Sequence, residues 1–146
     1  MIEFRPATGE DLPGIHRVWW AADRFEELND NPWFGQVLRT GSMMVAMFEG
    51  WLVGFAGVRQ VGRTSVVSDC FVDPEHQAQG IGTRLLSLLL AGERPVMTLA
   101  SSDPNARSLY SRFGMAPQWD CHYVEGDPTR VDRGMARVLE VGLYPV

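Results

Sequence analysis

The stretch from residue 43 to residue 72 constrains the fold of this chain more than any other. Three runs typical of β-strands, 43–48, 51–58 and 64–72, are separated by the turn dipeptides Glu49-Gly50 and Gly62-Arg63. Strand-like runs separated by such short turns are typical of β-hairpins. The three runs are therefore expected to form an antiparallel meander.

Helical segments are predicted on both sides of this meander along the chain. Thr8 is typical of a helix N-cap, and apolar residues recur at helical spacing from Leu12 to Trp19. Further helical segments are expected at residues 25–28, 33–38, 80–91 and 103–114. Short strands are expected at 2–5 and 96–100, and a last hairpin at 115–124 and 134–141. This order predicts one mixed α/β domain spanning residues 1–146.

The charged residues narrow the classes of partner. All 13 basic residues of the 146-residue chain are arginine, against 18 acidic residues, which gives a formal net charge of −5. No nucleic acid and no anionic membrane surface is expected as the main partner, because binding to either needs a basic face. The lack of lysine excludes Schiff-base mechanisms and the P-loop lysine. The excess of carboxylates suits amine substrates.

The sequence also gives an expectation for the compartment. No run reaches the roughly 18 apolar residues of a membrane span, and the N-terminus lacks the pattern of a signal peptide. Cys70 and Cys121 lie far apart and form no CxxC motif. We therefore expect free thiols in a reducing cytoplasm. From the residues alone, each thiol is either a nucleophile or a packed apolar side chain.

The chemistry of the chain is expected in the segment 68–83. A strand ends at Asp73-Pro74, and a loop containing Gly80 and Gly82 then opens a leucine-rich helix. A helix N-terminus offers unpaired N–H groups and the positive end of the helix dipole, and glycine lets an anion approach the backbone closely. This pattern predicts a phosphate or pyrophosphate site built from backbone. It lacks the third glycine of a Rossmann fingerprint and the lysine of a P-loop.

Three motifs occur in order along the chain. They read Phe4-Arg5-Pro6, then Phe71-Val72-Asp73-Pro74 with Gln77-Ala78-Gln79-Gly80-Ile81-Gly82, then Leu109-Tyr110-Ser111-Arg112-Phe113-Gly114-Met115. In this order they resemble the GNAT superfamily of acyl-CoA-dependent acyltransferases, and the resemblance covers essentially the whole chain. It implies a central, mostly antiparallel and splayed sheet of six to seven strands, flanked by about four helices.

The resemblance implies acetyl-CoA as co-substrate and no metal. The loop from Gln77 to Thr83 would bind the pyrophosphate, and Tyr110 would protonate the departing thiolate. A tyrosine suits that role because its ordinary pKa of about 10 keeps it protonated at neutral pH. On the residues alone, the favoured interpretation is a helix tyrosine packed beside Phe113. The cofactor-binding residues are expected to be Phe71, Val72, Gln77, Ala78, Gln79, Gly80, Ile81, Gly82, Thr83, Arg84, Asn105 and Tyr110.

Two of these residues rest on separate reasoning. Arg84 is the fixed cation nearest to a loop that carries no formal charge, and Arg107 and Arg112 follow on the next helix. Many members of the family carry an asparagine seven residues before the tyrosine, where this chain has Asp103. Asn105 lies two residues later, so either residue is a candidate for that contact.

The acceptor side needs a base for the attacking amine. Asp69 is the first choice, because it lies in an apolar strand where burial raises a carboxyl pKa; the alternative is an aspartate that faces solvent or an arginine. Glu26, Glu27, Asp120 and His122 are further candidates. His16 is expected at the surface and His76 in a loop. The residues expected to bind the acceptor are Trp20, Glu26, Glu27 and Trp33.

The function predicted from the sequence is transfer of an acetyl group from acetyl-CoA to a primary amine of a small molecule by direct attack. One alternative is a non-catalytic acyl-CoA-binding sensor module. Another is a protein or peptide N-acetyltransferase. A homodimer is possible through an exposed edge of the last hairpin.

Overall fold

The computed structural model describes residues 1–23, 31–92 and 94–121. The chain divides into two compact units, Met1–Ala116 and Pro117–Val146. The first unit contains every helix and strand of the described residues, and only 117–121 are described in the second. A single domain over 1–146 stays a prediction.

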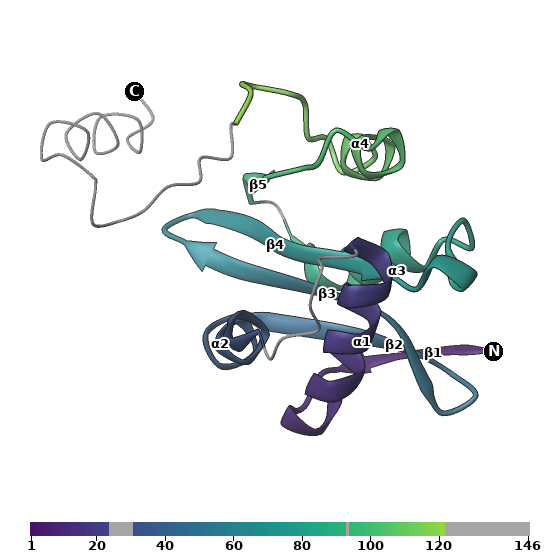
Figure 1. Cartoon of the computed structure of the whole chain (residues 1–146). Helices are drawn as coiled ribbons and strands as arrows, with labels where there is room; N and C mark the ends of the chain where they lie inside the picture. The colour runs from purple at the N-terminus through teal and green to yellow at the C-terminus, as the bar shows by residue number, and fades with distance from the viewer. Residues whose placement is uncertain (24–30, 93, 122–146) are drawn as a thin grey trace, which may run out of the picture. The chain divides into compact units, whose positions relative to one another are not determined.

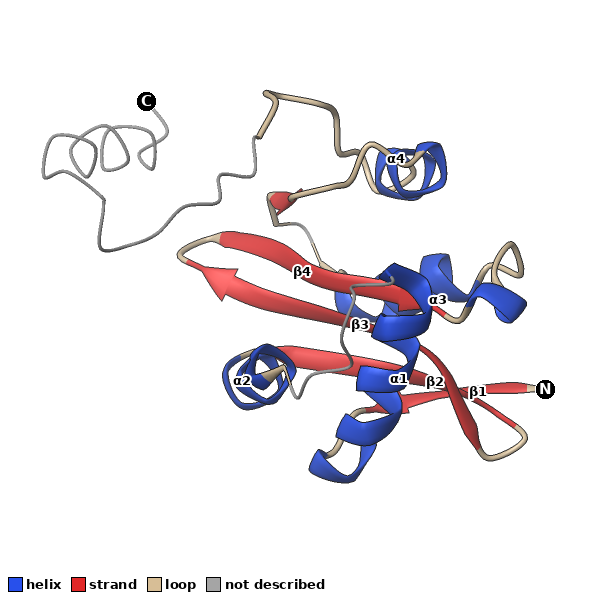
Figure 2. Ribbon diagram, in the orientation of Figure 1, coloured by secondary structure: helices blue, strands red, loops and turns tan. Residues whose placement is uncertain are grey.

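Five strands form one sheet in the order β1-β2-β3-β4-β5 (Figure 2). They are β1 (Ile2–Pro6), β2 (Ser42–Phe48), β3 (Trp51–Val61), β4 (Thr64–Val72) and β5 (Val96–Thr98). The strands β1 to β4 pair antiparallel, and β5 pairs parallel to β4. The predicted meander of β2, β3 and β4 is therefore confirmed, with turns at Glu49-Gly50 and Gly62-Arg63.

In the described part of the chain, four α-helices and two short 3-10 helices accompany the sheet. They are η1 (Gly9–Asp11), α1 (Leu12–Asp23), α2 (Pro32–Thr40), η2 (Pro74–His76), α3 (Ile81–Leu89) and α4 (Pro104–Ser111). Polar caps fix three of the starts: the side chains of Asn31, Asp73 and Asp103 each accept the N–H two residues on. A proline follows each of these caps, where its missing N–H costs nothing.

Two apolar clusters pack on the two faces of the sheet. On one face α1 and α2 cover β2 and β3, and Figure 1 shows α1 crossing in front of the strands. On the other face α3 packs on β2, β3 and β4 together with residues of α4. The first cluster holds Ile15, Val18, Phe34, Val37, Met43, Val45, Leu52 and Phe55. The second holds Ala46, Val53, Ala56, Val58, Val67, Ile81, Leu85 and Leu86.

Strand β4 carries one residue more than its partner. Asp69 pairs with Gly57 and Val67 pairs with Val58, so that Ser68 between them has no partner on β3. Such a β-bulge breaks the alternation of side chains along a strand. A Cβ on Gly57 would lie 3.0 Å from the Ser68 hydroxyl oxygen and from a methyl of Val37 in α2. Ser68 therefore faces α2.

The sheet opens between β4 and β5. Their ladder joins Ser65, Val66 and Val67 to Val96, Met97 and Thr98, and it ends there. From Ser68 to Val72, no strand of the described residues covers this edge of β4. Alternate backbone N–H and C=O groups of an antiparallel strand point to each of its edges, so this stretch can bind a polar chain.

Some sequence predictions differ from the structure or lie outside it. Six or seven strands are not confirmed: residues 115–121 contain no strand, and 122–146 lie outside the described residues, as does the predicted helical segment 25–28. His16 was expected at the surface, and this was wrong. Its ring is half-buried, 5.4 Å from that of Phe34, and it accepts the N–H of Asn31.

Candidate active site

The loop from Gln77 to Gly80 leads into the N-terminus of α3. Ala78 and Gly80 both have positive φ, +62° and +77°, which lets the exposed chain turn sharply before the helix. The first intrahelical bond runs from the Arg84 N–H to the Gly80 carbonyl, 3.0 Å. The N–H groups of Ile81, Gly82 and Thr83 precede that bond and lack intrahelical acceptors. This geometry suits a phosphate group.

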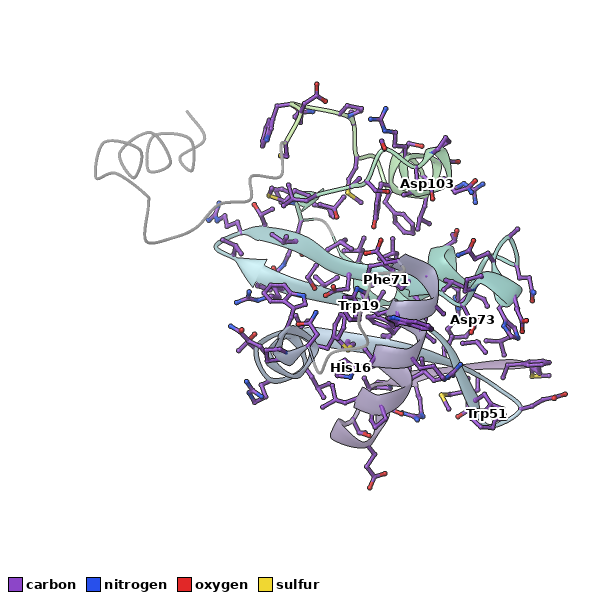
Figure 3. The ribbon with its side chains drawn as sticks, in the orientation of Figure 1. His16, Trp19, Trp51, Phe71, Asp73 and Asp103 are labelled. Carbon is purple, nitrogen blue, oxygen red and sulfur yellow. The ribbon has the colours of Figure 1, made fainter. Side chains whose placement is uncertain are left out.

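The start of this loop is anchored to the sheet and to α1. The Asp73 N–H donates to the Val53 carbonyl at 2.9 Å, and the Asp73 carboxylate lies 3.6 Å from the guanidinium of Arg17 in α1. The Gln77 side chain donates to the Val72 carbonyl at 3.0 Å. Figure 3 places Asp73 beside the first turn of α3. These bonds hold the loop in place before the helix begins.

The two glycines of the loop serve different purposes. Gly80 needs its left-handed backbone, and a Cβ there would meet nothing within 4 Å. Gly82 needs its small size, because a Cβ would lie 3.3 Å from a methyl of Leu109 and 3.6 Å from the Cys70 sulfur. The sequence pattern assigned both glycines to anion approach. The structure assigns Gly82 to the close packing of α3 against β4 and α4.

Tyr110 of α4 packs against the cluster beneath α3, and Phe113 packs there too. Burial raises the pKa of Tyr110 to about 12; the neighbouring Cys70 and Asp69 add to the rise, and the Thr98 side chain opposes it. A phenol with this pKa is protonated at neutral pH and can serve as a proton donor. Burial also raises the pKa of the Cys70 thiol to about 12. Cys70 is thus a packed thiol rather than a nucleophile.

Asp69 faces the opposite side of β4. It is 8% exposed, and its two carboxylate oxygens accept the indole N–H of Trp33 in α2 at 3.2 and 3.1 Å. Burial raises the pKa of Asp69, while the neighbouring Ser68 hydroxyl and the Trp33 N–H oppose the rise. The alternative of a solvent-facing aspartate is therefore wrong, and no salt bridge joins Asp69 to an arginine among the described residues.

The carboxyl group of Asp69 and the phenol of Tyr110 thus lie on the two faces of one strand. Asp69 lies on the α2 face and Tyr110 packs on the α3 face. The two groups are close enough for the charge of Asp69 to contribute to the raised pKa of Tyr110. Between them runs the edge of β4 that β5 leaves uncovered, with Phe71 and Val72 on it. Figure 3 shows Phe71 on the open stretch of β4.

Other predicted residues are placed less tightly. Trp20 is 42% and Trp33 is 36% exposed. Asn105 is exposed, and its backbone N–H donates to the capping carboxylate of Asp103, as expected of a helix start. Asp120 is exposed in the second unit, and Glu26, Glu27 and His122 lie outside the described residues. His76 lies in η2, half-buried, and its ring is 5.5 Å from that of Phe48.

The described residues contain no group of His, Cys, Asp and Glu suited to hold a metal ion. In the described part of the chain, no helix is long and apolar enough to cross a membrane. A hollow of about 250 Å³ lies at the other end of α3, lined by Leu89, Gly92, Arg94 and neighbours. It lies away from the N-terminal loop of α3, which is an open surface rather than an enclosed cavity.

Arg84 provides a test of the loop. It is exposed in the first turn of α3, next to the unpaired N–H groups. We expect Arg84→Ala to weaken CoA binding about three- to tenfold, because one exposed charge-assisted contact to a phosphate is lost. Titration calorimetry with CoA measures the effect, with Arg63→Ala, in the β3–β4 turn, as the control. Unchanged affinity in Arg84→Ala would refute this role.

Comparison with known families decides the assignment. The family model described as "Acetyltransferase (GNAT) domain" matches residues 39–114, just over half of the chain. This chain belongs to the GNAT acetyltransferase family. The match spans the meander, the loop, α3 and α4, which contain Asp69, Gly80 and Tyr110. Among curated proteins compared by sequence, none matches.

Solved structures share the GNAT fold with this chain. One is the ribosomal-protein-S18-alanine N-acetyltransferase from Escherichia coli, at TM-score 0.67 and 22% identity over 78% of this chain and 77% of that chain. Another is PH1933 from Pyrococcus horikoshii, at TM-score 0.72 and 18% identity over 84% and 93%. A third is the aminoglycoside N-acetyltransferase AAC(6′)-Iy in complex with CoA, at TM-score 0.68 and 14% identity over 86% and 95%. At these identities the likeness supports the fold.

Proposed function

We propose that this GNAT acetyltransferase transfers an acetyl group from acetyl-CoA to a primary amine of a small molecule. The observation that carries the proposal is the pairing of a buried carboxylate, Asp69, with a protonated phenol, Tyr110, on the two faces of the uncovered stretch of β4. Direct transfer to an amine needs a base on one side of the thioester and an acid on the other.

The loop residues hold the co-substrate in this proposal. The N–H groups at the start of α3 bind the pyrophosphate, aided by the helix dipole and by Arg84. The open edge of β4 at Phe71 and Val72 offers backbone groups to the amides of the pantetheine arm. The solved structure of one relative, AAC(6′)-Iy, is a complex with CoA, which is consistent with this use of the fold.

The chemical step then uses three groups of the protein. Asp69 accepts a proton from the ammonium form of the acceptor, directly or through water. A backbone N–H at Phe71 or Val72 donates to the oxygen of the attacked carbonyl as negative charge develops there. Tyr110 donates its proton to the leaving sulfur. The acceptor lies on the α2 face, where Trp33 and Trp20 are partly exposed.

A protein or peptide acceptor is the second candidate. The Escherichia coli relative is named for a ribosomal protein, and AAC(6′)-Iy is named for aminoglycosides, so relatives of similar fold act on both kinds of amine. A small molecule is favoured here by the compactness of the Trp33–Asp69 site, in which one indole covers the carboxylate. A cytoplasmic location and a homodimer stay predictions.

A thermal-shift screen tests the co-substrate and the acceptor together. Ligand at 100 times its Kd stabilises a protein by about 2.7 kcal/mol, a shift of several degrees in Tm. We expect that shift with acetyl-CoA and with CoA, and release of free thiol when an amine panel is added. The absence of any shift at millimolar CoA would refute the proposal. A shift without turnover over the whole panel would favour a sensor module.

A further inference from the structure

A cation and an anion flank the same indole on the α2 face of the sheet. The Asp69 carboxylate accepts the N–H of Trp33, at 3.1 Å for the nearer oxygen. The guanidinium carbon of Arg59, on β3, lies 5.5 Å from the centroid of the Trp33 ring. The three side chains come from β4, α2 and β3, and they form a row of carboxylate, indole and guanidinium.

Neither charge in this row is neutralised by a partner of opposite sign within the described residues. The salt bridges there involve Arg5, Arg17 and His76 as the cations, with Asp11 and Asp73 as the anions. A carboxylate that is 8% exposed loses most of its hydration, and one indole N–H replaces only part of it. Arg59 is half-buried and stacks on an aromatic ring. Both charges are therefore available to a bound molecule.

The strand register sets the spacing of the two charges. Gly57 pairs with Asp69, and Arg59 follows Gly57 by two residues on β3. Residues two apart on a strand point to the same face about 7 Å from each other. Gly57 has no side chain, and on this face the space above it is taken by Ser68, Val37 and Met43; Arg59 lies further along β3, beside Trp33. The spacing fits two charged groups of one small molecule.

We propose that the acceptor is a primary amine that also carries an anionic group, a carboxylate or a phosphate, and that Arg59 binds the anion while Asp69 receives the ammonium. This inference rests on the proposed function. A guanidinium is suited to the role because its planar fork binds both oxygens of such an anion at once. Stacking on Trp33 fixes the plane of that fork before the ligand arrives. Arg59 is then a specificity-determining residue.

Matched pairs of amines test the inference. Each pair differs only in the anion: phenylalanine against phenethylamine, β-alanine against ethylamine, and phosphoethanolamine against ethanolamine. Affinity is measured by titration calorimetry on protein saturated with CoA, and kcat/KM is measured with acetyl-CoA. The first two pairs report on a carboxylate and the third reports on a phosphate. We expect the anionic member of at least one pair to be preferred by about tenfold or more.

Variants at residue 59 test whether Arg59 causes the preference for the anionic amines. In Arg59→Met the preference should fall to near unity, whereas the neutral amines and CoA should bind as before. Arg59→Lys should keep part of the preference, because the charge remains and the bidentate fork is lost. Arg63→Met, in the exposed β3–β4 turn, should behave like wild type. Unchanged CoA affinity shows that each variant is folded.

The outcomes separate this inference from the proposed function. Equal binding of the anionic and neutral members by wild type, or an equal preference in wild type and Arg59→Met, overturns the inference even if neutral amines are acetylated. Preferential binding of the anionic members, lost in Arg59→Met, supports the inference even if no amine is turned over. That second result would contradict the proposed function alone.

Discussion

Asp69→Asn is expected to lower kcat by about 10²–10⁴-fold, the range typical for loss of a positioned general base. An asparagine has nearly the shape of an aspartate and still accepts the Trp33 N–H, but it cannot take a proton from the acceptor. CoA affinity should be unchanged, because Asp69 faces α2 while the loop that receives the pyrophosphate opens α3. Steady-state kinetics and CoA titration measure the two quantities separately.

The pH profile gives an independent check on Asp69. Its carboxyl must be ionised to act, and burial raises its pKa above the ordinary value. In wild type, kcat/KM should therefore fall as the pH is lowered through this raised pKa, and Asp69→Asn should lack that limb. Asp120→Asn, at the exposed alternative base, is the matched control. A large loss of activity in Asp120→Asn, with Asp69→Asn retaining activity, would contradict the assignment of Asp69 as the base.

The same substitution is expected to stabilise the fold at neutral pH. A carboxyl whose pKa is raised on folding binds more protons in the native state than in the unfolded state. Its ionisation therefore opposes folding as the pH rises from the ordinary carboxyl range through the raised pKa. Asp69→Asn should have a higher Tm than wild type at pH 7 and not at pH 3. A lower Tm at pH 7 would argue against a costly buried charge.

Tyr110→Phe is expected to lower kcat by about 10²-fold or more, the lower end of the range for loss of a general acid. Phenylalanine keeps the ring that packs beneath α3 and removes only the hydroxyl, so CoA affinity should change less than about twofold. Turnover with acetyl-CoA and the best amine measures the loss. The phenol's pKa of about 12 means that no basic limb from this residue should appear below about pH 10 in wild type.

The control for Tyr110→Phe is the thermal stability of the variant. An unchanged Tm with a large fall in kcat assigns the effect to the hydroxyl. If Tyr110→Phe turns over like wild type, the thiolate is protonated by another donor and the proposed acid is wrong. If wild type binds CoA but acetylates no amine, the sensor alternative is favoured instead.

Local patterns were enough to predict most of the secondary structure. The meander from β2 to β4 follows from strand-like runs and two tight turns, and the start of α4 follows from Asp103-Pro104. These signals act between residues close in sequence, so they can be interpreted without knowledge of the fold. Of the last predicted hairpin, residues 115–121 form no strand, and residues 122–146 lie outside the described residues.

What the sequence could not supply is contact between distant segments. Nothing near Ser68 in the chain indicates a bulge, because the extra residue exists only relative to β3. The burial of His16 depends on Asn31 and Phe34 in another element. The pairing of Trp33 with Asp69, predicted separately as acceptor-binding residue and base, depends on α2 packing on β2 and β3 close enough to β4 for the indole to reach it. The place of Arg59 beside them carried no signal in the sequence.

The bulge at Ser68 determines the face of the sheet to which Asp69 points. In a regular strand, residues 69 and 67 would share a face, but here Asp69 lies toward α2 while Val67 belongs to the cluster beneath α3. If Ser68 instead entered the ladder opposite Gly57, Asp69 would pair one residue further along β3, and its carboxylate would turn toward the face on which Cys70 now packs. The face to which Asp69 points therefore depends on the bulge as well as on the sequence of β4. A change that removed the bulge but kept the length of β4 would silence the enzyme while leaving every proposed catalytic side chain in the chain.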